Sequence, residues 1–191
     1  MDLATFALIP GAGRSQRMGR DKLLLAVDGQ PAVVRLLETA LSVCEGAVLV
    51  LGANRDAVAE AIAGQPWRER VRIAVNLRPE RGMFSSVLAG LAHVPSLVPL
   101  YVQPADAPMV SAATYRALLP ALGGHDAVIP IYEGAGGHPV LLSPSTVAHL
   151  LRQPAESSLR DELHRLDVLR LAVPDPAILH NWNTPADITH I

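Results

Sequence analysis

Short apolar segments alternate along the chain with stretches whose apolar residues recur at helical spacing. The expected strands cover residues 5–9, 47–51, 71–75, 97–103 and 127–131. The expected helices between them cover residues 32–43, 55–63, 84–92 and 112–122. Several of these strands are apolar throughout, which is typical of strands covered on both faces. The alternation therefore predicts an α/β fold with a mostly parallel sheet and right-handed crossovers.

The pattern changes after the fifth expected strand. A glycine-rich turn at residues 134–137 precedes an expected strand at 138–142, and a helix at 159–166 and a strand at 168–173 follow. The chain contains neither a repeat nor a segment that resembles a long linker. At 191 residues it can bury a substantial core. We therefore expect residues 1–191 to form one domain.

Composition excludes several classes of protein. Hydrophobic residues make up 50% of the chain and charged residues 18%, which argues against global disorder. The net charge of −2 provides no bulk attraction to nucleic acid or to an anionic membrane. We found no signal-peptide pattern and no apolar stretch near the ~20 residues of a membrane span. These features predict a cytoplasmic protein that binds neither nucleic acid nor membrane.

The chain has a single cysteine, Cys44, in a helix-like segment. One cysteine cannot form an intrachain disulfide, and a cysteine-rich metal site is likewise excluded. We expect Cys44 to be a buried packing residue rather than a nucleophile.

A glycine-punctuated basic loop follows the first expected strand. Its glycines are Gly11, Gly13 and Gly19, and its cations are Arg14, Arg17, Arg20 and Lys22. Glycines let the backbone direct N–H groups inward and approach an anion closely. The cations would neutralise the charge that those amides hold. The loop is therefore suited to the triphosphate of a nucleotide, although an ordinary turn with exposed arginines is the alternative.

Two better-known phosphate loops do not fit this segment. A Walker A loop requires four residues between its glycines and a lysine directly after the second. Here five residues separate Gly13 from Gly19, and Lys22 comes three residues later. A dinucleotide-binding loop requires a third glycine where Gln16 stands, and no acidic residue ends the second expected strand. The loop thus belongs to neither class.

Three further polar segments follow expected strands, at residues 76–86, 103–108 and 133–138. Open α/β sheets bind ligands beyond the carboxyl ends of their strands. We therefore expect these segments and the basic loop to meet at one cleft.

Asp106 lies between Pro104 and Pro108, directly after an apolar strand. A carboxylate held rigidly at a strand end is a candidate ligand for Mg²⁺, which commonly uses one or two carboxylates together with phosphates and waters. The alternative is that Asp106 caps the next helix, although Ser111 is closer to that helix start.

The other two segments offer further polar groups. Asn76 follows a strand, and Ser85 and Ser86 open a helix whose free N–H groups and hydroxyls could hold a ligand. Capping of their own helix explains the serines equally well. His138 stands beside the glycine-rich turn, where a structural role is the alternative to a functional one.

Taken together, these segments identify a family. The run Gly11-Ala12-Gly13-x-Ser15-x-Arg17-Met18-Gly19-x-x-Lys22 resembles the L-A-A-G-x-S-x-R-M-G-x-x-K signature of MobA-like nucleotidyltransferases. Further matches follow in the same order: Asp28-Gly29-Gln30-Pro31, Gly82-Met83-Phe84-Ser85-Ser86, Pro104-x-Asp106-x-Pro108, Gly137-His138-Pro139 and Asn183-Thr184-Pro185-x-Asp187. The set covers nearly the whole chain, and the molybdenum cofactor cytidylyltransferases are the most similar members.

The resemblance implies a three-layer α/β/α Rossmann-like nucleotidyltransferase fold and a reaction of an NTP with Mg²⁺. An acceptor phosphate would attack the α-phosphorus and release pyrophosphate. The residues implied to bind the nucleotide are Gly11, Ala12, Gly13, Arg14, Ser15, Gly19, Lys22, Asn76, Ser85 and Ser86. Arg17 and Lys22 would stabilise growing charge, Asp106 would hold the metal, and His138 would line the acceptor side.

Within the resemblance, three features bear on the base, the metal and the acceptor. Guanylyltransferases of the family tend to have glycine where Ala12 stands, so Ala12 favours CTP. Asn183 replaces an aspartate that can be a second metal ligand in relatives, so either Asp106 binds the ion with phosphates and water alone or Asp187 contributes. Residues 155–160 lack the glycines of a common G-x-x-G-x-R stretch, which bears on the choice of acceptor. Acceptors left open are molybdopterin and a sugar or polyol phosphate. A molybdoenzyme or chaperone could receive the product.

Two other classes of function remain alternatives. The departures at Asn183 and at residues 155–160 suggest a nucleotide-binding regulator without turnover. The α/β pattern alone would also suit a nicotinamide-dependent oxidoreductase, which the unusual glycine spacing disfavours.

Overall fold

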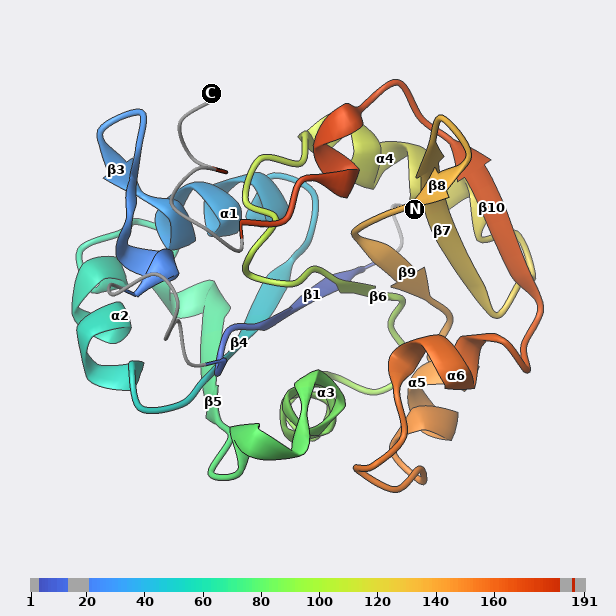
Figure 1. Ribbon diagram of the computed structural model, residues 1–191, viewed down its shortest axis with the longest axis horizontal. Coiled ribbons are helices and arrows are strands. Elements are labelled where there is room, and N and C mark those ends of the chain that lie inside the picture. Colours follow the sequence, from blue (N-terminus) through green and yellow to red (C-terminus); the bar gives the residue numbers. More distant parts are fainter. Residues whose placement is uncertain (1–3, 14–20, 183–186, 188–191) are drawn as a thin grey trace.

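A computed structural model describes residues 4–13, 21–182 and 187. The described residues form an 8-stranded sheet in the order β10-β7-β9-β6-β1-β4-β5, with β8 paired to β7 (Figure 1). The strands are β1 (Phe6–Pro10), β4 (Gly46–Leu51), β5 (Val71–Val75), β6 (Leu100–Val102), β7 (Ala127–Tyr132), β8 (Ala135–Gly136), β9 (Val140–Leu142) and β10 (Val168–Ala172). Neighbouring strands are parallel except where β9 pairs with β6 and β7 and where β8 pairs with β7. The expected mostly parallel sheet is confirmed.

Helices cover both faces of this sheet, as the three-layer expectation required. They are α1 (Ala32–Leu41), α2 (Arg55–Ile62), α3 (Met83–Leu91), α4 (Ala112–Ala121), α5 (Pro144–Leu150) and α6 (Leu159–Leu163). Figure 1 shows α1 and α4 on one side of the sheet and α3, α5 and α6 on the other. Short 3-10 helices lie at η1 (Lys22–Leu24), η2 (Arg68–Arg70), η3 (Pro79–Arg81) and η4 (Pro176–Leu179). The structure is therefore a three-layer α/β/α arrangement.

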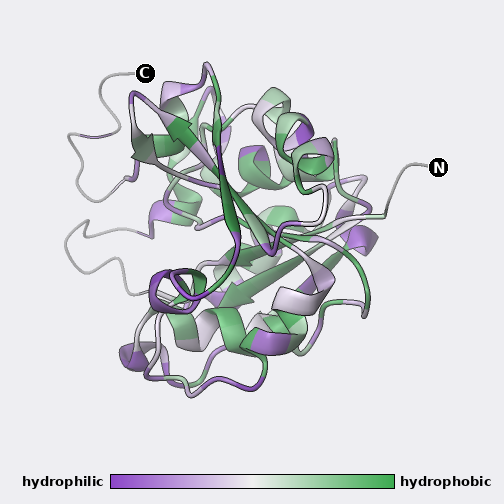
Figure 2. Cartoon of the chain, turned by 90° about the vertical axis from the view of Figure 1, so that its right-hand side faces the viewer, coloured by the Kyte–Doolittle hydropathy of each residue, from purple (hydrophilic) through white to green (hydrophobic). Residues whose placement is uncertain are grey.

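The apolar core is divided in two by the sheet. Successive side chains of a strand point to opposite faces. In β1, Ala7 and Ile9 accordingly pack with α1 and α4, whereas Leu8 packs with α3. All six residues of β4 are buried, which explains why that strand is apolar throughout. In Figure 2 the central strands are largely green and purple segments lie mostly on outer helices and loops.

Helix α3 lies unusually close to the sheet because of one glycine. A Cβ atom on Gly90 would lie 2.1 Å from Cδ1 of Leu8 and 2.6 Å from Cγ2 of Val50. The absence of a side chain there lets the helix pack directly on β1 and β4. Ser85 and Ser86 lie at the other end of this helix, in its first turn.

Several expected boundaries were wrong by a few residues. The strand expected at 97–103 begins at Leu100, because Leu97 is in the left-handed region with a φ of 64° and is 87% exposed. The strand expected at 138–142 begins at Val140, and the helix expected at 159–166 ends at Leu163. The sequence analysis also missed α5, although Ser143 caps it and Pro144 stands at its first position.

A short β2–β3 hairpin (Ala26–Val27 and Gln30–Pro31) was likewise missed. Its turn consists of Asp28 and Gly29, both with positive φ. Such an Asp-Gly pair between short strands is a hairpin signal that could have been detected. Among the described residues, no helix is long and apolar enough to cross a membrane.

Candidate active site

Loops from three separate strand ends meet at a small cavity of about 130 Å³. Its lining residues are Pro10, Gly11, Ala12, Gly13, Lys22, Pro79, Gly82, Met83, Ser86, Pro104 and Asp106. They come from the loop after β1, the segment between β5 and α3, and the turn after β6. Because β1, β5 and β6 run in one direction in the sheet, their carboxyl ends meet at one edge.

Asp106 faces Lys22 across this cavity. Nζ of Lys22 lies 3.3 Å from Oδ2 of Asp106, and the two side chains are 21% and 14% exposed. Oδ1 of Asp106 is buried, and no hydrogen bond to it is formed by the described residues. A buried carboxylate oxygen without a donor is costly unless a ligand or cation completes it. Asp106 therefore fits the role of a metal ligand.

The capping alternative for Asp106 is not supported by the structure. Ser111 caps α4, since its side chain accepts a hydrogen bond from the backbone N–H of Thr114. The backbone of Asp106 is held independently, because its carbonyl accepts a hydrogen bond of 2.7 Å from the N–H of Trp182. The carboxylate is thus available to the cavity.

A fully buried glutamine holds the turn that carries Asp106. Nε2 of Gln103 donates to the carbonyl oxygens of Pro104 (3.2 Å) and Ala107 (2.9 Å), one on each side of Asp106. The N–H of Ala105 also donates to the carbonyl of Pro10, which joins this turn to the β1 loop. Sequence reasoning missed Gln103, although a glutamine that ends an apolar strand before P-x-D-x-P was a detectable signal.

Asn54 ties the start of the basic loop to the neighbouring strand. Its Oδ1 accepts from the N–H of Gly52 at 3.1 Å, and its Nδ2 donates to the carbonyl of Gly11 at 3.3 Å. The N–H of Gly11 donates to the carbonyl of Val50. The exit of β1 is therefore held from both sides. The sequence offered no clear signal for this role of Asn54.

Asn76 organises the opposite wall of the small cavity. Its Nδ2 donates to the hydroxyl oxygens of Ser85 and Ser86, both at 2.9 Å, and all three residues are buried. Ser85 in turn donates to the carbonyl of Gly82 at 2.7 Å. Ser86 lines the cavity itself, whereas Asn76 and Ser85 lie behind it. The structure thus brings these three residues together, and their role in binding a nucleotide stays a prediction.

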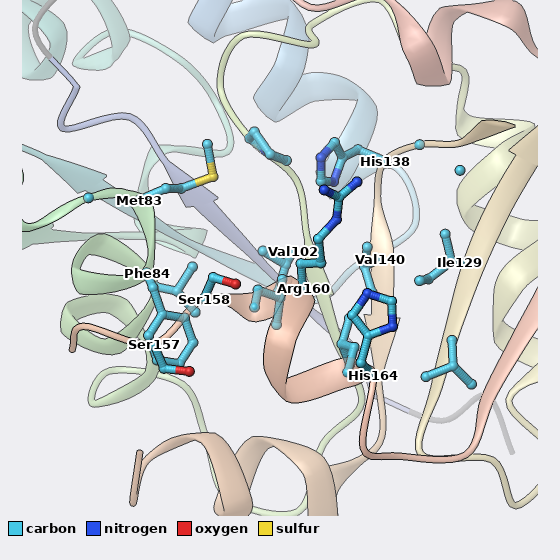
Figure 3. A pocket seen from close by; sticks show the side chains of 18 of the residues that line it. Met83, Phe84, Val102, Ile129, His138, Val140, Ser157, Ser158, Arg160 and His164 are labelled. Carbon is cyan, nitrogen blue, oxygen red and sulfur yellow. The ribbon is translucent and has the colours of Figure 1, made fainter. Parts of the chain in front are cut away.

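A second, larger cavity of about 660 Å³ adjoins the first (Figure 3). The two share Gly82, Met83 and Pro104 as lining residues. His138 lines the larger cavity, and its buried Nδ1 has no hydrogen-bond partner among the described residues. Burial lowers the pKa of His138, and the negative charge of Asp106 opposes that shift. His138 is therefore in electrostatic range of the small cavity.

The backbone of His138 is held by a close approach. Its N–H donates to the carbonyl of Ile178 at 3.1 Å, and a Cβ on Gly137 would lie 2.3 Å from that same oxygen. A glycine is therefore required beside His138.

Some expected site residues lie outside the described part of the chain. These are Arg14, Ser15, Arg17 and Gly19 of the basic loop, together with Asn183. Within residues 4–13, 21–182 and 187, no group of three or more His, Cys, Asp or Glu side chains could hold a metal ion. Among the described residues, Asp106 is therefore the candidate ligand for a metal at this site, and Mg²⁺ commonly adds phosphates and water to one or two carboxylates.

Comparison with known proteins identifies the family of this chain. The model of the MobA-like NTP transferase domain matches residues 7–169. The molybdenum cofactor cytidylyltransferase of Escherichia coli (strain K12) is 25% identical over 94% of this chain and 91% of its own. The nicotine blue oxidoreductase of Paenarthrobacter nicotinovorans is 38% identical, but over only 56% of this chain and 52% of its own.

A solved structure of Rv0371c from Mycobacterium tuberculosis H37Rv has the same fold. Its TM-score is 0.83 at 25% identity, over 98% of this chain and 96% of that one. Rv0371c has also been solved as a complex with manganese, with a TM-score of 0.73 at 23% identity over 90% of this chain and 88% of that one. The described cavity, the fold and the matched residues lead to one conclusion: this chain belongs to the MobA-like NTP transferase family.

Proposed function

We propose that this protein transfers CMP from CTP to the phosphate of a molybdopterin-type acceptor and releases pyrophosphate. An acceptor phosphate oxygen would form a bond to the α-phosphorus, and the bond from that phosphorus to the pyrophosphate oxygen would break. The observation that carries the proposal is the placement of Asp106: its Oδ2 pairs with Lys22, its buried Oδ1 has no hydrogen-bond partner among the described residues, and it lines one cavity together with Lys22, Gly11 and Gly13.

Asp106 is the residue that would hold Mg²⁺. When bound, the ion supplies positive charge that neutralises phosphate oxygens and orients them for displacement. The manganese complex of Rv0371c supports a divalent cation in a protein of this fold. Asp106 fits this role because its side chain is largely buried, it lies in the turn after β6, and Gln103 holds that turn on both sides of it.

Lys22 and the glycine backbone would bind the phosphates. A lysine is a compact charge that suits a phosphate, and its position beside Asp106 places that charge next to the proposed metal ligand. The backbone at Gly11 and Gly13 can approach the phosphates closely because no side chains intervene. Reactions of this kind depend chiefly on positioning and on charge neutralisation.

The proposed preference for CTP rests on Ala12. This residue lines the small cavity and is only 4% exposed, so its methyl group limits the space for a base. Ser86, held by Asn76, would contact the nucleotide from the opposite wall. The likeness to a cytidylyltransferase over nearly the whole chain supports the same preference.

The test is pyrophosphate release with purified molybdopterin, Mg²⁺ and each of the four ribonucleoside triphosphates. We expect release with CTP to exceed that with the other nucleotides and to require the acceptor. Release with sugar or polyol phosphates instead would keep the chemistry and change the acceptor. Binding of CTP without release would favour the regulator, whereas tight binding of NADH in its place would favour an oxidoreductase.

A second measurement tests nucleotide binding at Lys22 without requiring turnover. Lys22 is the only lysine in the 191-residue sequence. Acylation of ε-amines, followed by mass spectrometry of the peptide that contains residue 22, therefore reports on this one side chain. We expect Mg²⁺ and CTP together to protect Lys22. Equal labelling with and without nucleotide would contradict its placement at the phosphates.

A further inference from the structure

The larger cavity combines apolar walls with a positively charged lining. Figure 3 shows Phe84 on one side of the view and Ile129 and Val140 on the other. Three arginines also line the cavity, and none of the described residues that line it is acidic. A cavity of about 660 Å³ with apolar walls and a few charged groups has the dimensions of a small-molecule site. Its lining favours a ligand that joins an apolar body to an anion.

The three arginines differ in what they contact. Arg81 forms an ion pair with Glu156, so part of its charge is already compensated. The side chain of Arg170 lies toward β8, since a Cβ on Gly136 would be 3.8 Å from its Nη1. Neither Arg160 nor Arg170 forms an ion pair with any residue that the structure describes. The guanidinium groups of both are therefore open to an anionic partner, and the direction of their side chains separates them.

Arg160 also points toward the part of the cavity that adjoins the nucleotide side. In Figure 3 its side chain extends from α6 toward His138. His138 is in electrostatic range of Asp106, and Pro104 lines both cavities. An anion held between Arg160 and His138 would consequently lie in the cavity that adjoins the one lined by Asp106, on the side from which an attacking phosphate could approach.

The segment that presents Arg160 is anchored from behind. Glu162 is 2% exposed; its Oε2 lies 3.1 Å from Nε2 of His149, and its Oε1 accepts a hydrogen bond from Ser157. These contacts join α6 to α5 and to the loop at residues 157–158. Arg160 therefore projects from a fixed turn although its own side chain is exposed.

We infer that Arg160 binds the attacking phosphate of the acceptor and that the apolar walls select an acceptor whose phosphate is attached to a ring system. The inference rests on the proposed function. It separates the two classes of acceptor considered there, a molybdopterin-type phosphate and a sugar or polyol phosphate. A sugar or polyol phosphate would leave the walls formed by Phe84 and Ile129 without an apolar partner. A planar guanidinium also suits a phosphate, because it can donate two parallel hydrogen bonds.

The test measures binding by calorimetry with 1-naphthyl phosphate, which joins a ring system to a phosphate. Inorganic phosphate, glycerol 3-phosphate and 1-naphthol are the partial probes. We expect each to bind the native protein at least about 10-fold more weakly than 1-naphthyl phosphate, because each lacks one half of the recognition. Equal binding of glycerol 3-phosphate, or no binding of 1-naphthyl phosphate, would overturn the ring-system part of the inference.

Arg160→Ala is expected to weaken binding of 1-naphthyl phosphate by about 10-fold or more, because the charge-assisted contact is lost. Arg160→Lys should weaken it by less, because lysine keeps the charge but cannot donate the two parallel hydrogen bonds. Arg116→Ala is the matched control, because Arg116 is an exposed arginine on α4, in the opposite layer. Native affinity in Arg160→Ala would refute the role of Arg160.

Binding of CTP with Mg²⁺ is measured on the same preparations. We expect it to be unchanged in Arg160→Ala, since the arginine does not line the small cavity. Failure of the native protein to bind CTP would contradict the proposed function, whereas the naphthyl phosphate series would still decide the role of Arg160.

Discussion

Replacement of Asp106 by asparagine isolates its charge from its shape. Asparagine keeps the size of the side chain, and the backbone contact with Trp182 is unaffected. The substitution removes the ion pair with Lys22, whose Nζ lies 3.3 Å away. One partly buried pair of this kind contributes about 1 kcal/mol, because water screens it incompletely. For a chain of this size, the melting temperature should then fall by about 2–4 °C.

The effect on turnover should be much larger than the effect on stability. A charge that contacts the reacting phosphates stabilises the transition state by about 3–4 kcal/mol, which corresponds to 10²- to 10³-fold in rate. We therefore expect Asp106→Asn to remain folded while pyrophosphate release falls by at least that factor. Binding of Mn²⁺ in the presence of CTP, followed by electron paramagnetic resonance, should weaken in parallel.

Asp56→Asn provides a matched control, since Asp56 is 98% exposed on α2 and lies away from both cavities. It should leave turnover, metal binding and melting temperature unchanged. If Asp106→Asn releases pyrophosphate at the native rate, Asp106 is not the metal ligand. If it unfolds instead, the carboxylate serves the packing of the turn, and the argument from its unpartnered oxygen fails.

Three further predictions concern the fold. Gly137→Ala should destabilise the protein by about 1–3 kcal/mol in chemical denaturation, since the new methyl group would collide with the carbonyl of Ile178; native stability would show that this contact is easily relaxed. Cys44 should resist labelling by thiol reagents until the protein unfolds, because burial raises the pKa of its thiol to about 12; rapid native labelling would contradict its burial. Burial would raise the pKa of Asp175, but hydrogen bonds from Thr114 and Ser111 outweigh burial and lower it below 3.8. Its contribution to stability is therefore present above about pH 4 and lost as the pH falls through the lowered pKa, so Asp175→Asn should flatten the acid dependence of unfolding. An unchanged acid profile would show that Asp175 has the same pKa in the folded and unfolded chain.

The expected architecture followed from local patterns. Buried strands such as β4 must be apolar on both faces, and this leaves a visible run in the sequence. Element ends were less predictable, as at Leu97, where the chain turns although its residues are as apolar as those of the strand. Short elements such as α5 depend on tertiary packing for most of their stability and gave only weak signals.

The sequence pointed to the charged residues and glycines of the candidate site, but not to the residues whose hydrogen bonds hold them in place. Asp106 and Lys22 were identified because each lies in a recognisable motif of a loop that follows a strand: P-x-D-x-P for Asp106 and the glycine-punctuated basic loop for Lys22. Gln103 and Asn54 were missed, since each acts through hydrogen bonds to a backbone that only the folded chain brings within reach. The role of Asn76 behind Ser85 and Ser86 depends in the same way on the packing of α3.

The order of apolar and polar residues by itself determined the layered α/β architecture and placed glycines and charges at strand ends, because the periods of strands and helices are local properties. It could not determine distances between loops that are 84 residues apart, such as the 3.3 Å between Lys22 and Asp106. Nor could it show the larger cavity beside them, whose walls come from α3, β7, β9 and α6. Those features arise only when parallel strands align their carboxyl ends and helices close on both faces of the sheet.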